Sequence, residues 1–249
     1  MHDLFGYKHI ILMIVSFTAI IVGFILTRKL SYSKMLKGML IIGVISEIIK
    51  VFYYIIQNEN TLGGYLPKAD LPFHLCSIQI IFLFVLFLAK SDKIKRIIMS
   101  FMIPSCLFGG IFAILIATYT SRNGLWILTL QYFGYHAAIS VFALYLFRNL
   151  KLTIRDYINC LIFLGVIGML SIYLNSVLYD GTNNVNFMYT VSPPEDNLPY
   201  LNKDDGWFAY ILRYASLAVL LITLLYIKPI INNFRKPKVI IKEETDYVS

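Results

Sequence analysis

The residues best suited to chemistry in this chain are a cysteine and a histidine in separate apolar stretches. Cys76 stands in LPFHLCSIQI, residues 71–80, and His136 stands in LQYFGYHAAIS, residues 130–140. A thiolate can attack an acyl carbon while an imidazole takes and returns protons. Because surroundings of low polarity favour the neutral thiol, such a cysteine needs a base or a cation nearby. We therefore interpret Cys76 as a candidate nucleophile and His136 as its candidate base.

The elements that must position these two residues are membrane helices. Only 14% of the 249 residues are charged, against roughly 25% in a soluble domain, and the mean hydropathy is +0.71. The apolar stretches are continuous rather than alternating, and each can cross a ~30 Å hydrocarbon core as a helix. The sequence predicts an all-α polytopic membrane protein, a bundle of seven transmembrane helices within residues 1–230, at 9–27, 35–57, 72–89, 97–118, 125–147, 157–179 and 207–227.

Charge placement predicts how these helices are oriented. Basic residues dominate the connections 28–37, 90–96 and 148–156 and the stretch 228–238, which all fall on one side. Because basic connections stay in the cytoplasm, we expect the N-terminus outside and the C-terminus cytoplasmic. We also expect the protein to be integral to a bacterial cytoplasmic membrane. The net charge of +8 then reflects topology and anionic lipid, so we expect a membrane phospholipid and not nucleic acid as partner.

Two segments on the opposite side are longer than ordinary turns. Residues 58–71 form a loop with glycine and proline directly before Cys76, and residues 180–206 form a long outer loop rich in aromatic residues and acidic groups. We expect the second loop to be either a partly ordered cap or flexible. The cytoplasmic tail, residues 231–249, is basic and then acidic and has too little apolar content to bury, so we expect it to be disordered.

Polar side chains inside the apolar stretches point to a site, because burying ionisable groups in a membrane is costly. They map between the midplane and the outer face, which predicts a polar cavity open to the outer leaflet. Arg213 or Lys50, near the headgroup level, could hold the phosphate of a phospholipid. The predicted substrate-binding residues are Glu47, Lys50, His74, Gln79, Tyr132, Asn175, Tyr210 and Arg213.

Several of these residues also have purely structural explanations. Glu47 and Lys50 stand three positions apart and could form a local ion pair. Tyr210 suits the aromatic belt at a membrane interface, and His74 suits an interfacial or capping position.

Helix geometry separates the two reactive residues of the LPFHLCSIQI stretch. In a regular helix beginning at Pro72, Gln79 shares a face with Cys76 while His74 points about 200° away. We therefore expect the partner of Cys76 to be His136, from a distant helix. His136 should then lie ~8 Å or more deeper than Cys76, unless the first turn near Pro72 is not helical.

The sequence resembles the YwaF-like integral membrane protein family, which is related to the transmembrane protein 164 acyltransferase family. LPFHLCS resembles the family signature LPLHLC, and GGIFAIL precedes the stretch that contains GYHAAIS. NNVNFMYTVSPPEDN resembles the family's N-Y-(M/L)-x-L…P segment before a W-x-x-Y helix, here Trp207 to Tyr210. The resemblance covers about residues 35–227.

The resemblance implies a seven-span fold and, from the eukaryotic branch, acyl transfer between phospholipids through the cysteine of the signature. That role maps to Cys76, and the histidine on the later helix maps to His136. The sequence departs from the family pattern at Ser77, where aspartate is common, and at Phe187, where tyrosine is common.

These observations favour a membrane-embedded phospholipid acyltransferase or acyl hydrolase with a cysteine acyl-enzyme. We expect no cofactor and no metal, since Cys76, Cys106 and Cys160 have no C-x-x-C spacing. The alternative is a non-enzymatic binding or transport module for a small ligand or lipid headgroup. A seven-span sensor is a third hypothesis.

Overall fold

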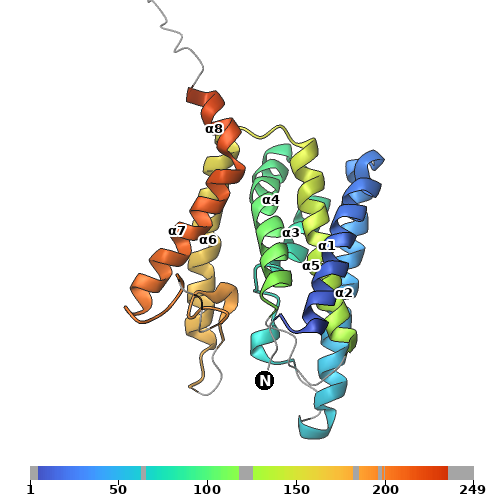
Figure 1. Ribbon diagram of the computed structural model, residues 1–249, viewed down its shortest axis with the longest axis vertical. Coiled ribbons are helices and arrows are strands. Elements are labelled where there is room, and N and C mark those ends of the chain that lie inside the picture. Colours follow the sequence, from blue (N-terminus) through green and yellow to red (C-terminus); the bar gives the residue numbers. More distant parts are fainter. Residues whose placement is uncertain are drawn as a thin grey trace, which may run out of the picture.

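The computed structural model describes residues 5–62, 66–117, 126–181, 185–195, 198 and 200–234, with the backbone alone for 57–62. All regular structure in these residues is helical, which confirms the predicted all-α class (Figure 1). The elements are α1 (Tyr7–Leu26), η1 (Thr27–Lys29), α2 (Tyr32–Leu62), η2 (Lys68–Asp70), α3 (Ile78–Leu88), α4 (Asp92–Leu115), α5 (Trp126–Asn149), α6 (Ile154–Leu178), η3 (Phe187–Tyr189), α7 (Trp207–Leu225) and α8 (Ile227–Phe234).

Six helices in the described part of the chain are long and apolar enough to cross a membrane. They are α1, α2, α4, α5, α6 and α7, and their outward faces carry large apolar side chains suited to lipid. The chain is therefore an integral membrane protein. Residues 231–234, predicted as the start of a disordered tail, belong to α8, and residues 235–249 lie outside the described residues.

The helix predicted at 72–89 is shorter than expected. Only Ile78–Leu88, 11 residues, is α-helical, which spans ~16 Å or about half of a hydrocarbon core. Residues 72–77 form turns instead, and the side chains of Gln79 and Tyr135 bind the carbonyl oxygens of Leu75 and Cys76 in this stretch. The assumption of a regular helix from Pro72, used above to separate His74 from Cys76, was therefore wrong.

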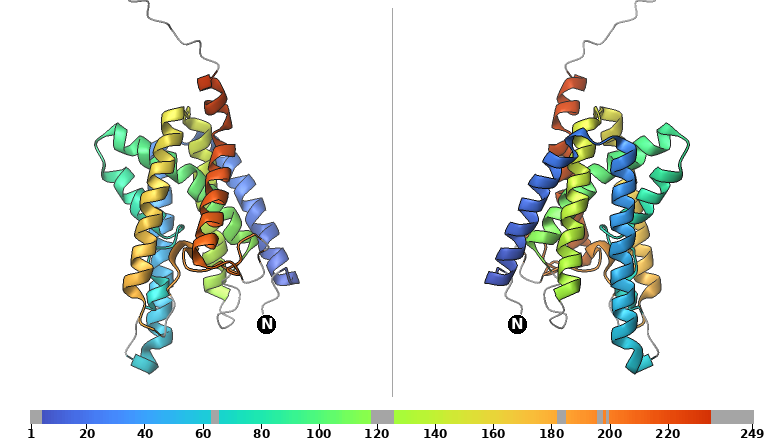
Figure 2. Two further views of the ribbon diagram at one scale, coloured as in Figure 1. Left: turned by 90° about the vertical axis from the view of Figure 1, so that its left-hand side faces the viewer. Right: turned by 90° about the vertical axis from the view of Figure 1, so that its right-hand side faces the viewer.

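Helices α4 and α5 form the centre of the bundle. Over half of the membrane-spanning window of each is buried, 56%, against 11% for α1 and α7. They pack against each other along most of their length, with α1 and α2 beside α5, and α6 and α7 on the side of α4 (Figure 1). The side views show the connections between α1 and α2 and between α5 and α6 at one end of the bundle and the segment before α7 near the other end (Figure 2). The end with these connections, which are rich in basic residues, is called the basic end.

Two features of α4 depend on its neighbours. Pro104 cannot donate to the carbonyl of Ser100, and the Tyr226 hydroxyl donates to that oxygen instead, at 2.9 Å. Gly110 meets α5 so closely that a Cβ there would lie 2.2 Å from Ser140 Oγ and 2.7 Å from the His136 carbonyl oxygen. The close packing of α4 on α5 therefore requires glycine at this position.

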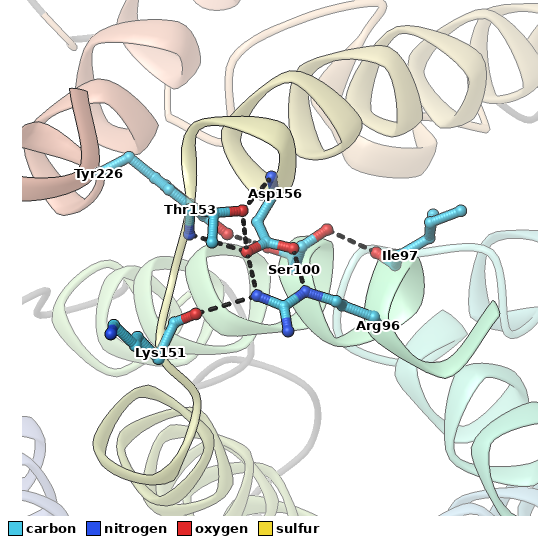
Figure 3. Close-up of polar contacts among 7 residues, drawn as sticks. All are labelled: Arg96, Ile97, Ser100, Lys151, Thr153, Asp156 and Tyr226. Carbon is cyan, nitrogen blue, oxygen red and sulfur yellow. Dashed lines mark hydrogen bonds and ion pairs between the residues drawn. The ribbon is translucent and has the colours of Figure 1, made fainter. Parts of the chain in front are cut away.

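An ion pair ties α4 to α6 at the basic end of the bundle (Figure 3). Arg96 donates from Nε and Nη2 to the two carboxylate oxygens of Asp156, at 2.7 Å each, and from Nη2 to the Lys151 carbonyl at 2.9 Å. Asp156 is almost fully buried and also accepts from the Thr153 backbone and hydroxyl, which completes a capping box at the start of α6.

Replacing Gly110 by alanine should destabilise the bundle. The new methyl group would overlap Ser140 Oγ, so we expect a loss of about 1–3 kcal/mol in the free energy of unfolding, measured as a lower Tm in detergent. Gly165→Ala on α6 is the matched control, since nothing lies within 4 Å of a Cβ there. Equal stability of the two variants would contradict the close α4–α5 contact.

Candidate functional site

Cys76 and His136 lie at similar distances from the basic end of the bundle. Cys76 precedes Leu88, the end of α3, by 12 residues, and His136 precedes Asn149, the end of α5, by 13 residues. At 1.5 Å per residue both lie roughly 18–20 Å from the basic end of the bundle. Counted from this end, the two residues differ by only about one residue of rise, whereas counting from the outer ends of the two predicted spans gives the ~8 Å offset.

The surroundings of Cys76 include α4 and α5. The Tyr135 hydroxyl donates to the Cys76 carbonyl oxygen at 3.0 Å. A Cβ on Gly109 would lie 3.6 Å from Cys76 Sγ, so α4 passes directly beside the sulfur at this glycine. Cys76 is a free cysteine, and the residue is half-buried.

His136 is held in one tautomer. Its Nδ1 lies 2.6 Å from the Tyr132 carbonyl oxygen, which can only accept, so Nδ1 carries the proton. In the neutral ring Nε2 is then the basic nitrogen. The Tyr132 ring packs on the imidazole with centroids 4.2 Å apart, and its hydroxyl donates to the Ala113 carbonyl. Among the described residues no hydrogen bond joins His136 to Cys76.

The adjacent glycines Gly109 and Gly110 lie beside the two candidate catalytic residues. Gly109 faces the sulfur of Cys76, and Gly110 faces the backbone of His136. Sequence reasoning missed both glycines as site residues, although GGIFAIL was noted as a motif. It also missed Tyr135. The position of this tyrosine next to His136, on an apolar helix, was the feature that would have indicated it as a site residue.

Other predicted residues hold the segment that leads to Cys76, residues 66–77, here called the cysteine segment. Lys50 Nζ donates to the Asp70 carbonyl at 2.8 Å and pairs with Glu47 at 2.7 Å. The His74 ring bonds to the Ala69 carbonyl at 3.0 Å. Glu47 and Lys50 thus form the local ion pair that their spacing allowed, and Lys50 also binds backbone.

A second irregular stretch, residues 185–192, here called the aromatic segment, is bound by α6 and α7. Asn175 accepts from the Phe187 N–H at 2.8 Å and donates to the Phe187 carbonyl at 3.1 Å, and Ser171 donates to the same carbonyl at 2.7 Å. The Tyr210 hydroxyl donates to the Tyr189 carbonyl. Sequence reasoning missed Ser171, which stands one turn before Asn175 on the same face of α6.

The two segments meet each other through aromatic rings. Phe73 lies edge-on to Phe187 with ring centroids 5.4 Å apart, and His74 contacts Phe187 at 5.2 Å and Tyr189 at 6.1 Å. His74, Asn175 and Tyr210 therefore all contact the aromatic segment. His74, for which no pairing with Cys76 was predicted, connects the two segments through these ring contacts.

The last two predicted residues differ in position, since Gln79 binds the cysteine segment and Arg213 does not. Gln79 is fully buried and donates to the Leu75 carbonyl at 2.8 Å and to Ser105 Oγ at 3.1 Å. Arg213 bonds to Asn202 Oδ1 at 2.5 Å and pairs with Asp205, so it holds the loop before α7. The structure does not bring Arg213 together with the other predicted residues.

A cavity of about 280 Å³ lies between α6, the aromatic segment and the start of α7. Asn175, Thr190 and Trp207 line it, but Cys76 and His136 do not. Among the described residues no group of three or more histidine, cysteine or acidic side chains is arranged to hold a metal ion.

The sequence model of the TMEM164 family matches residues 4–226. The chain belongs to the TMEM164 family. This match confirms the predicted relation to transmembrane protein 164, and its range contains Cys76, His136 and both irregular segments. No curated protein and no solved structure matches the chain significantly. The TMEM164 family assignment thus covers the whole candidate site.

Replacing Asn175 by leucine should loosen the aromatic segment. The change keeps the side-chain volume but leaves the Phe187 N–H without its acceptor, so we expect a loss of about 1–3 kcal/mol, seen as a lower Tm. Met169→Leu on the exposed face of α6 is the control. If both variants unfold at the same temperature, the amide of Asn175 does not hold this segment.

Proposed function

We propose that this TMEM164 family protein is a membrane-embedded phospholipid acyltransferase or acyl hydrolase, with Cys76 as nucleophile and His136 as base. The observation that supports the proposal is a free, half-buried cysteine at about the same distance from the basic end as an imidazole with a fixed tautomer, with adjacent glycines beside both residues.

The first half of the reaction forms the acyl-enzyme. The side chain of Cys76 rotates toward His136, and Nε2 takes the thiol proton as Sγ bonds to the ester carbonyl carbon. The ester C–O bond breaks, and the leaving lysophospholipid oxygen receives the proton from the imidazolium. The acyl chain is then held on Cys76 as a thioester.

The second half returns the enzyme to its starting state. An acceptor hydroxyl gives its proton to Nε2 while its oxygen bonds to the thioester carbon. The C–S bond breaks, and the thiolate recovers the proton from His136. A lysophospholipid as acceptor makes the protein a transacylase, whereas water makes it a hydrolase.

The proposal predicts a thioester on Cys76. Purified protein incubated with a phospholipid that carries a radiolabelled acyl chain should gain label that neutral hydroxylamine removes. Cys76→Ala should lose this label, while Cys160→Ala, which removes a buried thiol near the basic end, should keep it. Equal labelling of the wild type and Cys76→Ala would end the acyl-enzyme proposal, and a bound, unmodified lipid would then favour the binding-module alternative.

The same labelling assay separates the role of His136. His136→Asn keeps a side-chain N–H for the Tyr132 carbonyl but has no basic nitrogen, so labelling should slow by about 10²–10⁴-fold at unchanged Tm. An unchanged labelling rate would show that another group activates the thiol.

We also propose that the chain crosses the membrane seven times, with the N-terminus outside and the C-terminus cytoplasmic. The starts of α2 and α4 and the end of α5 line one cavity at the basic end. Because α2 leaves that end and α4 starts from it, the chain must return between them. The cysteine segment and α3 together supply this seventh crossing.

This topology is tested by fusions at the C-terminus. A fused green fluorescent protein, which fluoresces when it folds in the cytoplasm, should be fluorescent, and fused alkaline phosphatase should be inactive. We expect this result because the C-terminus lies on the same side as the basic connections, which stay in the cytoplasm. The opposite pattern would reverse the orientation and place the Cys76 side of the bundle toward the cytoplasm.

A further inference from the structure

A second cavity, of about 440 Å³, lies at the basic end of the bundle, away from Cys76. It is formed where α2 and α4 begin and α5 ends. Its lining combines two cations and one carboxylate with polar and apolar groups, and it includes Tyr32, Asp92, Lys95, Arg96, Met99 and Leu150. This combination suits a ligand with a charged head and an apolar remainder.

Arg96 presents unused donors at this cavity. Nε and Nη2 are taken by Asp156 and the Lys151 carbonyl, but Nη1 makes no hydrogen bond with any described residue. Figure 3 shows this third nitrogen pointing away from Asp156. The ion pair therefore fixes the guanidinium plane and leaves one edge for an acceptor, such as a phosphate oxygen.

Lys95 supplies a second positive charge. Its only ion pair among the described residues is with Asp92, at 3.9 Å, and the Asp92 carboxylate is almost completely exposed, at 99%. Such a long and solvated pair contributes little, so the Lys95 ammonium can turn to an anion in the cavity.

The hydroxyl of Tyr32 is a third group, beside Arg96 and Lys95, that can donate a hydrogen bond to an anion in this cavity. It is buried and has no hydrogen-bond partner in the part of the chain that the structure describes. A buried hydroxyl without a partner is unfavourable, and a ligand oxygen that accepts a hydrogen bond from it would remove this penalty.

We propose that this cavity binds the phosphate group of an anionic phospholipid at the basic end of the bundle. Lys95 and Arg96 provide the charge, Tyr32 a further donor, and Met99 and Leu150 an apolar wall for the glycerol and upper acyl region. A lipid fits better than a soluble phosphate, because the cavity lies at the ends of membrane-crossing helices, where headgroups lie.

This lipid would not be the substrate of Cys76. The cysteine lies roughly 18 Å from the basic end by helix rise, further than the ester bonds of a lipid held there by its phosphate. The cavity is therefore a separate lipid site, and its existence does not depend on acyl transfer.

The proposal is tested by the lipid dependence of Tm in detergent. Added phosphatidylglycerol should raise the Tm of the wild type, and phosphatidylcholine, whose choline group would face Lys95 and Arg96, should raise it much less. Lys95→Gln should lose at least half of the phosphatidylglycerol effect. Tyr32→Phe should lose part of it, yet without lipid its Tm should be equal to or above that of the wild type, because the buried hydroxyl that it removes has no partner among the described residues.

Lys93→Gln is the matched control, since it removes the same charge two positions away from an exposed side chain that does not line the cavity. The control should keep the full lipid effect. An equal loss in Lys93→Gln and Lys95→Gln would overturn the site in favour of general charge attraction. A full lipid effect in both variants would also overturn the site, because Lys95 would then contribute nothing to lipid binding. Equal stabilisation by inorganic phosphate alone would overturn the lipid as its ligand.

Discussion

The fold depends on satisfying backbone carbonyl and N–H groups at depths where water is scarce. A helix does this internally, but the cysteine segment and the aromatic segment cannot. Side chains from the surrounding helices supply the missing partners. Lys50 binds Asp70, Tyr135 binds Cys76, and Asn175 binds Phe187. The costly polar residues inside the spans are thus used largely to hold irregular backbone in place.

The same constraint explains the strained part of the structure. Met188 and Tyr189 both have φ of 53°, a left-handed conformation that costs about 1–3 kcal/mol in a residue other than glycine. The conformation persists because Asn175, Ser171 and Tyr210 fix the flanking carbonyls. A stretch held this firmly can support the cysteine segment, which it contacts through Phe73 and His74.

Firm placement matters for the proposed chemistry. A thiol in an apolar bundle stays neutral unless a base is positioned beside it, and positioning is what the irregular segments and the adjacent glycines contribute. The basic end is organised differently. There Asp156 is buried because Arg96 and Thr153 neutralise and cap it, and the same ion pair orients Arg96 toward a separate cavity.

Sequence alone determined the properties that follow from composition and local order. Long apolar stretches predicted the helical class and six of the helices, and the family relation came from the order of short motifs. The pairing of Glu47 with Lys50 also followed from local spacing. Only the tertiary structure decided the course of residues 66–77, the role of His74 and the partners of Arg213, because these depend on contacts between residues far apart in the chain. Pro72 allowed either a regular helix or turns, and the bonds from Tyr135 and Lys50, which lie on other helices, select the turns.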